Sequence, residues 1–131
     1  MRKAHRAHVL AGILLLAAAA RAAPPVEFKR DIVPLLKVRC AVCHLTGEEA
    51  FGMALYPGAA YKSLVGVPSA ESPLLRVKPG KPDESYMIRK LEGTQEEAGG
   101  KGLQMPIDSG ALSRQEIDMI RAWIAEGAKD N

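Results

Sequence analysis

Apolar residues recur at helical spacing in four segments of the chain, and no segment of useful length alternates between apolar and polar residues as a strand would. We therefore predict four short helices, at residues 28–38, 59–65, 82–91 and 114–126. Ser113 and Glu116 have the spacing of a capping box, which supports the start of the last helix. The fold class predicted from this pattern is all-α.

Long segments rich in glycine and proline separate the predicted helices. Residues 47–57 and 94–110 have the composition of loops, and four prolines within residues 67–82 predict irregular backbone there. Loops of this length are uncommon in a compact domain unless they serve a functional site. The pattern thus predicts one small helical domain whose long loops surround a binding site.

The first 22 residues have the layout of a secretory signal peptide. Basic residues precede a continuous apolar run from Val9 to Ala20, and Ala20-Arg21-Ala22 offers a small-residue cleavage site. The run is shorter than the roughly 20 apolar residues of a transmembrane helix, although an uncleaved membrane anchor is the alternative. We expect a signal peptide at residues 1–22, a domain at residues 23–131, a periplasmic location and no membrane span in the mature chain.

The signal segment also accounts for the positive charge of the chain. It contains four basic residues and no acidic one, so the net charge of +3 for the whole sequence becomes −1 for residues 23–131. The mature chain therefore lacks the excess of basic residues that favours nucleic-acid binding, and we expect no nucleic-acid partner. His44 is its single histidine, because His5 and His8 lie in the signal segment.

Cys40, Cys43 and His44 form a C-x-x-C-H motif, which is the attachment sequence of a c-type haem. Cysteines three positions apart lie on one face of a helical turn, so both thiols can form thioether bonds to one edge of a porphyrin. The histidine that follows can bind the iron from the proximal side. We expect one covalently bound haem c per chain, around which the helices and loops pack.

Other interpretations of the cysteine pair are weaker. A disulfide between Cys40 and Cys43 would close almost no loop, so it would contribute little stability through chain entropy. A thiol–disulfide oxidoreductase also uses C-x-x-C, but the βαβ pattern that usually surrounds it does not occur in this chain. A structural zinc site needs four nitrogen or sulfur ligands, and the mature chain has only three cysteine and histidine residues.

The second axial ligand is predicted to be a methionine, because the mature chain has no second histidine. Met87 and Met119 lie in predicted helices, where packing in the core is the simpler role. Met53 lies nine residues after His44, which leaves a short path to the opposite face of the ring. Met105 lies in an irregular loop that can direct its thioether over the distal face. We predict Met105 as the distal ligand, with Met53 and an open position as alternatives.

The order of these features resembles a class I c-type cytochrome: C-x-x-C-H after an N-terminal helix, Gln104-Met105-Pro106 in a late loop, and a closing amphipathic helix. Residues 28–32, 61–64, 77–80 and 122–128 further resemble the cytochrome c-like domains common in planctomycetes and related bacteria. The resemblance implies a small cytochrome c-like domain with His44 proximal and Met105 distal. The chain lacks the K-x-G-P sequence and the strongly basic surface of mitochondrial-type members.

These features predict an electron carrier that exchanges single electrons with larger redox proteins in transient complexes. Iron with both axial positions filled has no place for a substrate, so we expect that the protein is not an enzyme. The alternative is a haem enzyme of the peroxidase-like kind, or a gas sensor, in which the distal ligand leaves the iron. Tyr61, Arg76 and Lys78 are candidates for contacts with the haem propionates.

Overall fold

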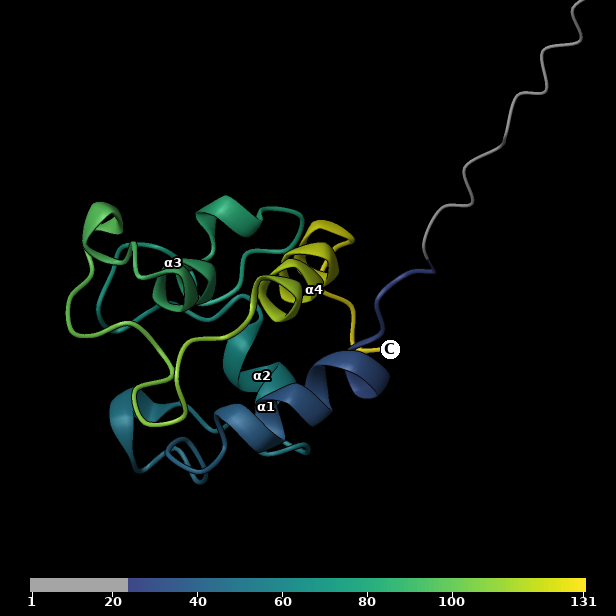
Figure 1. The fold of residues 1–131 in the computed structure, drawn as a ribbon, viewed down its shortest axis with the longest axis horizontal. Helices are drawn as coiled ribbons and strands as arrows, with labels where there is room; N and C mark the ends of the chain where they lie inside the picture. Colours follow the sequence, from purple (N-terminus) through teal and green to yellow (C-terminus); the bar gives the residue numbers. More distant parts are fainter. Residues whose placement is uncertain (1–23) are drawn as a thin grey trace, which may run out of the picture.

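The computed structural model describes residues 24–131, which form four α-helices joined by loops and short helical turns (Figure 1). The helices are α1 (Val33–Arg39), α2 (Ala60–Leu64), α3 (Tyr86–Glu92) and α4 (Arg114–Ala125). No strand occurs in this part of the chain, where extended pairing is confined to isolated bridges between residues 65 and 85. The all-α prediction is confirmed for the described residues, whereas the predicted signal peptide lies outside them.

The helix that precedes the C-x-x-C-H motif is built in two parts. Residues Phe28–Ile32 form a π-helical turn, which continues directly into α1. Pro34 lies in the first turn of α1, at the junction with the π-helical turn, and has no N–H to donate to that turn. None of the helices formed by residues 24–131 is both long and apolar enough to cross a membrane.

The third predicted helix is interrupted at Ser85. A short 3-10 turn, Pro82–Glu84, precedes α3, and Ser85 between them is extended, with φ −102° and ψ 120°. Ser85 is fully buried; its hydroxyl accepts a hydrogen bond from the Lys78 N–H and donates one to the Lys81 carbonyl, each at 2.9 Å. One continuous helix does not form because this serine fastens the preceding loop. Gly93 ends α3, close to the predicted end at residue 91, and has a φ of 75°.

α4 begins at the predicted capping box. The Glu116 N–H donates to the Ser113 hydroxyl at 3.3 Å, and the Ser113 N–H donates to the Glu116 carboxylate at 2.7 Å. Two N–H groups that the helix itself cannot satisfy therefore have partners. The apolar face of the helix is buried and consists of Ile117, Ile120, Trp123 and Ile124.

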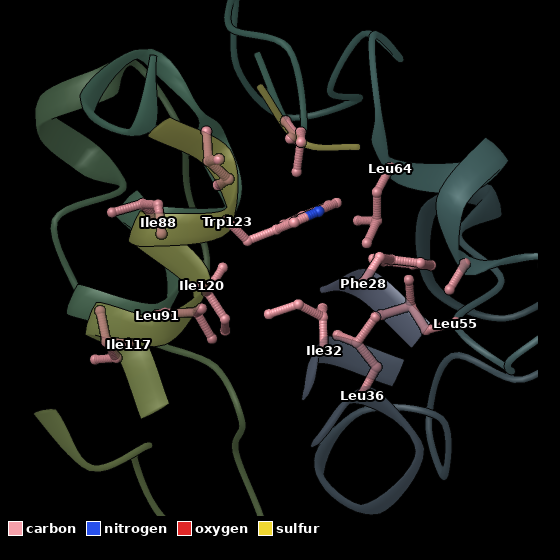
Figure 2. Close-up of a cluster of buried hydrophobic side chains, with 14 of the residues drawn as sticks. Phe28, Ile32, Leu36, Leu55, Leu64, Ile88, Leu91, Ile117, Ile120 and Trp123 are labelled. Atoms are coloured by element: carbon pink, nitrogen blue, oxygen red, sulfur yellow. The ribbon is translucent and has the colours of Figure 1, made fainter. Parts of the chain in front are cut away.

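Aromatic rings join the first helix to α2 and α4 in the centre of the core. Trp123 stacks on Phe28 with 5.0 Å between the ring centroids, and Phe28 meets Tyr61 edge-on at 5.4 Å. Figure 2 shows Trp123 reaching from α4 toward Phe28 and Leu64. The indole N–H of Trp123 donates to the Lys129 carbonyl at 2.9 Å, so the one polar atom of this ring is also satisfied.

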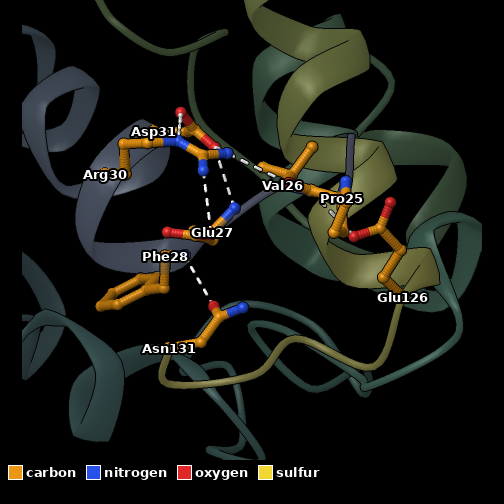
Figure 3. A network of polar contacts seen from close by, with 8 residues as sticks. All are labelled: Pro25, Val26, Glu27, Phe28, Arg30, Asp31, Glu126 and Asn131. Carbon is orange, nitrogen blue, oxygen red and sulfur yellow. Dashed lines mark hydrogen bonds and ion pairs between the residues drawn. The ribbon is translucent and has the colours of Figure 1, made fainter. Parts of the chain in front are cut away.

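The C-terminal residues fold back onto the start of the first helix (Figure 3). The side-chain oxygen of Asn131 accepts the Phe28 N–H, and its main-chain oxygen accepts the Lys29 N–H, both at 2.9 Å. Since the first N–H groups of a helix have no partner within it, Asn131 acts as their cap from the far end of the sequence. The C-terminus thereby lies beside the beginning of this helix, as Figure 1 also shows.

Candidate functional site

A cavity of about 380 Å³ lies beside the end of α1. This volume falls in the range of small-molecule and cofactor sites, roughly 300–1,000 Å³. The turn after α1, residues 69–71, α3 and the loop at residues 105–109 contribute to its walls. The four residues that the sequence predicts as the site all line this cavity: Cys40, Cys43, His44 and Met105.

The C-x-x-C-H motif forms a tight turn directly after α1, as its position in the sequence predicts. The Cys43 and His44 N–H groups both donate to the Cys40 carbonyl, at 3.2 and 3.1 Å. The main-chain oxygen of His44 accepts the Leu55 N–H at 2.6 Å, which ties the turn to the segment that follows. His44 is buried. The turn therefore holds both thiols and the imidazole on the wall of one cavity.

The two thiols lie in different surroundings. Cys43 is exposed, whereas Cys40 is half-buried and packs against the hydrophobic core; no disulfide joins them. Burial raises the pKa of the Cys40 thiol to about 11, against the opposing effect of the neighbouring Arg39 guanidinium. Cys40 is therefore protonated at neutral pH, whereas the attacking cysteine of a thiol–disulfide oxidoreductase has a lowered pKa.

Three methionines line the cavity: Met53, Met87 and Met105. The sequence assigns Met87 to the core, and it does pack against core residues, but it also faces the cavity from α3. Met119 packs against the core and is not among the cavity residues. Met105 differs from Met87 in lying on a loop without helical structure. The cavity wall thus contains the His44 imidazole and three methionine side chains.

Arg76 fastens the segment that follows the motif. Its guanidinium donates to the Phe51 carbonyl at 2.6 Å and to the Ser63 carbonyl at 2.8 Å. Phe51 has a φ of 60°, which a bulky side chain rarely adopts, so these bonds stabilise a strained backbone at the cavity rim. Burial lowers the pKa of Arg76, and the acceptors around it that bind its N–H groups are carbonyl and hydroxyl oxygens.

Of the three residues considered for propionate contacts, Arg76 lines the cavity and the other two do not. The Tyr61 hydroxyl donates to the Ala128 carbonyl at 3.0 Å, on the side of the aromatic core. Lys78 forms an ion pair with Glu84. Tyr61 and Lys78 therefore have structural partners elsewhere in the fold.

A polar cluster in the cavity wall was not found from the sequence. The Lys90 ammonium lies 3.3 Å from the Glu71 carboxylate, and the Tyr86 hydroxyl donates to the same carboxylate at 3.4 Å. Tyr86 and Lys90 are four residues apart on α3, so the sequence does carry the signal that they share a face. Glu71 lies in the proline-rich segment and carries no comparable signal.

The rim of the cavity is apolar and open to solvent. Within residues 24–131 seven large hydrophobic side chains are exposed, and four of them line this cavity: Val38, Val42, Phe51 and Ile107. A contiguous apolar patch exposed to solvent is typical of a binding surface, whereas single scattered hydrophobic side chains on a surface are ordinary. Within the same range no three histidine, cysteine, aspartate or glutamate side chains are grouped as ligands of a metal ion.

No protein-family model matches the chain, and neither a curated protein nor a solved structure matches it. The resemblance to c-type cytochromes therefore rests on the residues of the chain and on the cavity that they line.

Proposed function

We propose that this chain is an exported monohaem c-type cytochrome that carries single electrons between redox partners. The observation that supports this most is that two thiols on one turn, one imidazole and one thioether, from Cys40, Cys43, His44 and Met105, line a single cavity. Two thiols and a histidine in this order suit covalent attachment of haem c. Histidine with methionine is an axial pair of electron-carrying cytochromes.

The remainder of the cavity suits a flat apolar group. A bound haem would cover exposed side chains such as Val42, which is 84% exposed, and Phe51, which is 54% exposed. Burial of apolar surface contributes about 25 cal/mol per Å², so covering this rim would stabilise both the group and the surrounding loops. The chain has few aromatic residues with which to fill such a space itself.

Each site residue has a distinct role in this proposal. Cys40 and Cys43 would tether the group, and His44 and Met105 would bind its iron. When bound, haem supplies a one-electron iron couple, and the histidine–methionine pair raises its potential relative to other ligand sets. The chain fixes the ligands, excludes water from the buried side of the cavity and leaves the other side open.

The open rim is where we place the contacts with redox partners. Ile107 lies at the surface beside the cavity, so a partner could approach the group closely there. Redox encounters of this kind are small and short-lived, with less than about 1,200 Å² buried in total. The location that we propose is the periplasm, in keeping with the signal peptide predicted for residues 1–22.

Spectroscopy of the full-length chain, produced in a host that attaches haem c, tests this function. The haem should resist acid–acetone extraction, and the oxidised protein should be low-spin with a methionine–iron charge-transfer band at the red edge of the visible spectrum. The variant Cys40→Ser/Cys43→Ser should lose its haem on extraction. A wild-type chain without covalent haem would refute the proposal, and a high-spin spectrum would favour the peroxidase-like or gas-sensing alternative.

A matched set of variants identifies the distal ligand among the three methionines of the cavity. Met105→Ala should abolish the charge-transfer band, whereas Met53→Ala and Met87→Ala should leave it in place. The haem should stay covalently attached in all three, because none of them changes the C-x-x-C-H motif. Loss of the band in Met53→Ala or Met87→Ala alone would assign the ligand to that residue instead.

A further inference from the structure

The loop that carries Met105 is fastened chiefly by side chains. Among the described backbone-to-backbone hydrogen bonds, residues 101–110 contribute one, from the Met105 N–H to the Lys90 carbonyl at 3.0 Å. Two glutamine side chains add one bond each, both at 2.8 Å, which join Gln95 to the Gly102 carbonyl and Gln104 to the Leu91 carbonyl. The conformation of the loop therefore depends on donors outside its own backbone.

Lys90 holds this loop at three alternate residues. Its ammonium donates to the Lys101 carbonyl at 2.7 Å and to the Leu103 carbonyl at 3.2 Å. Its own carbonyl accepts the Met105 N–H, as described above. A single residue of α3 thus fixes the path of the chain up to the methionine.

The ammonium group of Lys90 is itself held in place. Its side chain is 12% exposed, and that of Glu71, 3.3 Å away, is 10% exposed. The Tyr86 ring lies with its centroid 6.0 Å from the ammonium, and its hydroxyl donates to Glu71. A charge removed from water in this way needs a fixed partner, so Glu71 and Tyr86 restrict the direction in which Lys90 donates.

Glycines let the loop lie directly on this cluster. A Cβ atom at Gly100 would lie 2.3 Å from the Tyr86 hydroxyl and 2.8 Å from the Gln95 carbonyl, closer than atoms approach. A Cβ at Gly102, where φ is 77°, would lie 3.2 Å from the Lys90 ammonium. The glycines before Met105 therefore allow the loop to pack directly against Tyr86 and Lys90.

We propose that Lys90, oriented by Glu71 and Tyr86, is the positioning residue for the Met105 thioether. This inference rests on the proposed function, in which Met105 binds the iron. The three cluster residues and Met105 line the same cavity, so the cluster determines where the thioether stands relative to His44. Lys90 acts through the loop, and the strength with which the methionine competes for the iron depends on it.

Competition with imidazole tests this role in the full-length protein with haem attached. Imidazole displaces the methionine from oxidised iron, and loss of the charge-transfer band follows the exchange. Lys90→Leu should lower the imidazole concentration for half-displacement by about tenfold or more. The reduction potential should fall with it, because a loosely held thioether favours the reduced iron less. Lys62→Leu, which changes an exposed lysine on α2, is the matched control and should behave as wild type.

Two further variants separate positioning from a general loss of folding. Lys90→Leu leaves Glu71 buried without its partner, so Lys90→Leu/Glu71→Gln removes both charges and should show the same weakened methionine. Lys90→Arg keeps charged donors and should restore most of the wild-type imidazole titration. In both leucine variants the Met105 amide should exchange its hydrogen faster, while the amides of α4 should exchange as in wild type.

The outcomes distinguish this inference from the function on which it rests. If wild type shows covalent haem and the charge-transfer band, but both leucine variants keep the wild-type imidazole titration and potential, Lys90 does not position Met105. If wild type itself lacks covalent haem or the band, the proposed function fails, and the role of Lys90 toward the iron fails with it.

Discussion

The two ends of the first helix lie in opposite environments. At its start Phe28 and Ile32 are fully buried against the aromatic core. At the other end Val38, in the last turn, and Val42, just beyond the helix, are 71% and 84% exposed beside the cavity. One end is thus completed by the side chains of the chain itself, and the other is left with apolar surface that the chain does not cover. The start of the helix therefore contributes to the stability of the core, and under the proposed function its end contributes to haem binding.

The backbone shows the same difference. The core end contains the capping box of α4 and the start of the first helix, which Asn131 caps. The cavity end contains a strained Phe51 and a loop anchored through side chains. Irregular backbone of this kind is kept where a site needs it and is stabilised from elsewhere.

If the chain binds haem as we propose, removal of the haem should have the largest effect, and only at the cavity end. In Cys40→Ser/Cys43→Ser freed of haem, the amides of α4 should keep opening free energies near the global stability, on the order of 5–15 kcal/mol. The amides of His44 and Met105 should open at a cost near zero, because the apolar group that the loops surround is missing. Hydrogen exchange followed by NMR measures both, and equal protection at the two ends would contradict the contrast.

Trp123→Ala should be the most damaging single change at the core end. Deletion of a large buried aromatic side chain costs about 3–5 kcal/mol, and this ring also stacks on Phe28. Urea unfolding measures the loss, with the exposed Tyr56→Ala as a control that should cost far less. In native buffer the haem spectrum should stay unchanged, and a shifted charge-transfer band would show that the two ends are coupled more closely than we infer.

Arg76→Leu should weaken the cavity end by a smaller amount. The loss of charged hydrogen bonds to the Phe51 and Ser63 carbonyls is expected to cost about 2 kcal/mol. The segment around Phe51 should also become more sensitive to proteases, because its left-handed backbone loses its support. Arg114→Leu, at an exposed arginine of α4, is the control and should change stability by less than about 0.5 kcal/mol.

Glu116→Gln should have the smallest effect and one that depends on pH. Hydrogen bonds from Ser113 lower the pKa of Glu116 below its usual 4.5, so the carboxylate stabilises the fold above pH 4.5 and loses this contribution as pH falls through the lowered value. Thermal unfolding should therefore separate wild type from the variant at neutral pH, and the separation should shrink as pH falls below 4.5. A separation that stays constant over this range would exclude the mechanism.

The sequence predicts those features that depend on neighbouring residues. The capping box of α4 needs only Ser113 and Glu116, and the turn of the C-x-x-C-H motif needs only the residues from Cys40 to His44. Gly93 ends α3 because glycine adopts the left-handed conformation that the turn requires. Each of these is decided within a few positions of the chain, where spacing carries the necessary information.

Features decided by distant partners could not be predicted in this way. Ser85 interrupts a helix because its buried hydroxyl bonds to the loop at Lys78 and Lys81, whose path the sequence pattern does not define. Glu71 lies in an irregular segment, and only the fold brings it to Lys90. The sequence pattern also does not predict that Met87 lines the cavity, because the direction of its side chain follows from packing in the fold.

The contact between Asn131 and the first helix bears on the order of events during synthesis. The Phe28 N–H finds its partner 103 residues later in the chain, so this cap can form only after Asn131 has been made. Until then the segment that leads to Cys40 and Cys43 lacks the contact that caps its first N–H groups. Asn131 thus closes, from more than 100 residues along the chain, the segment on which the motif stands.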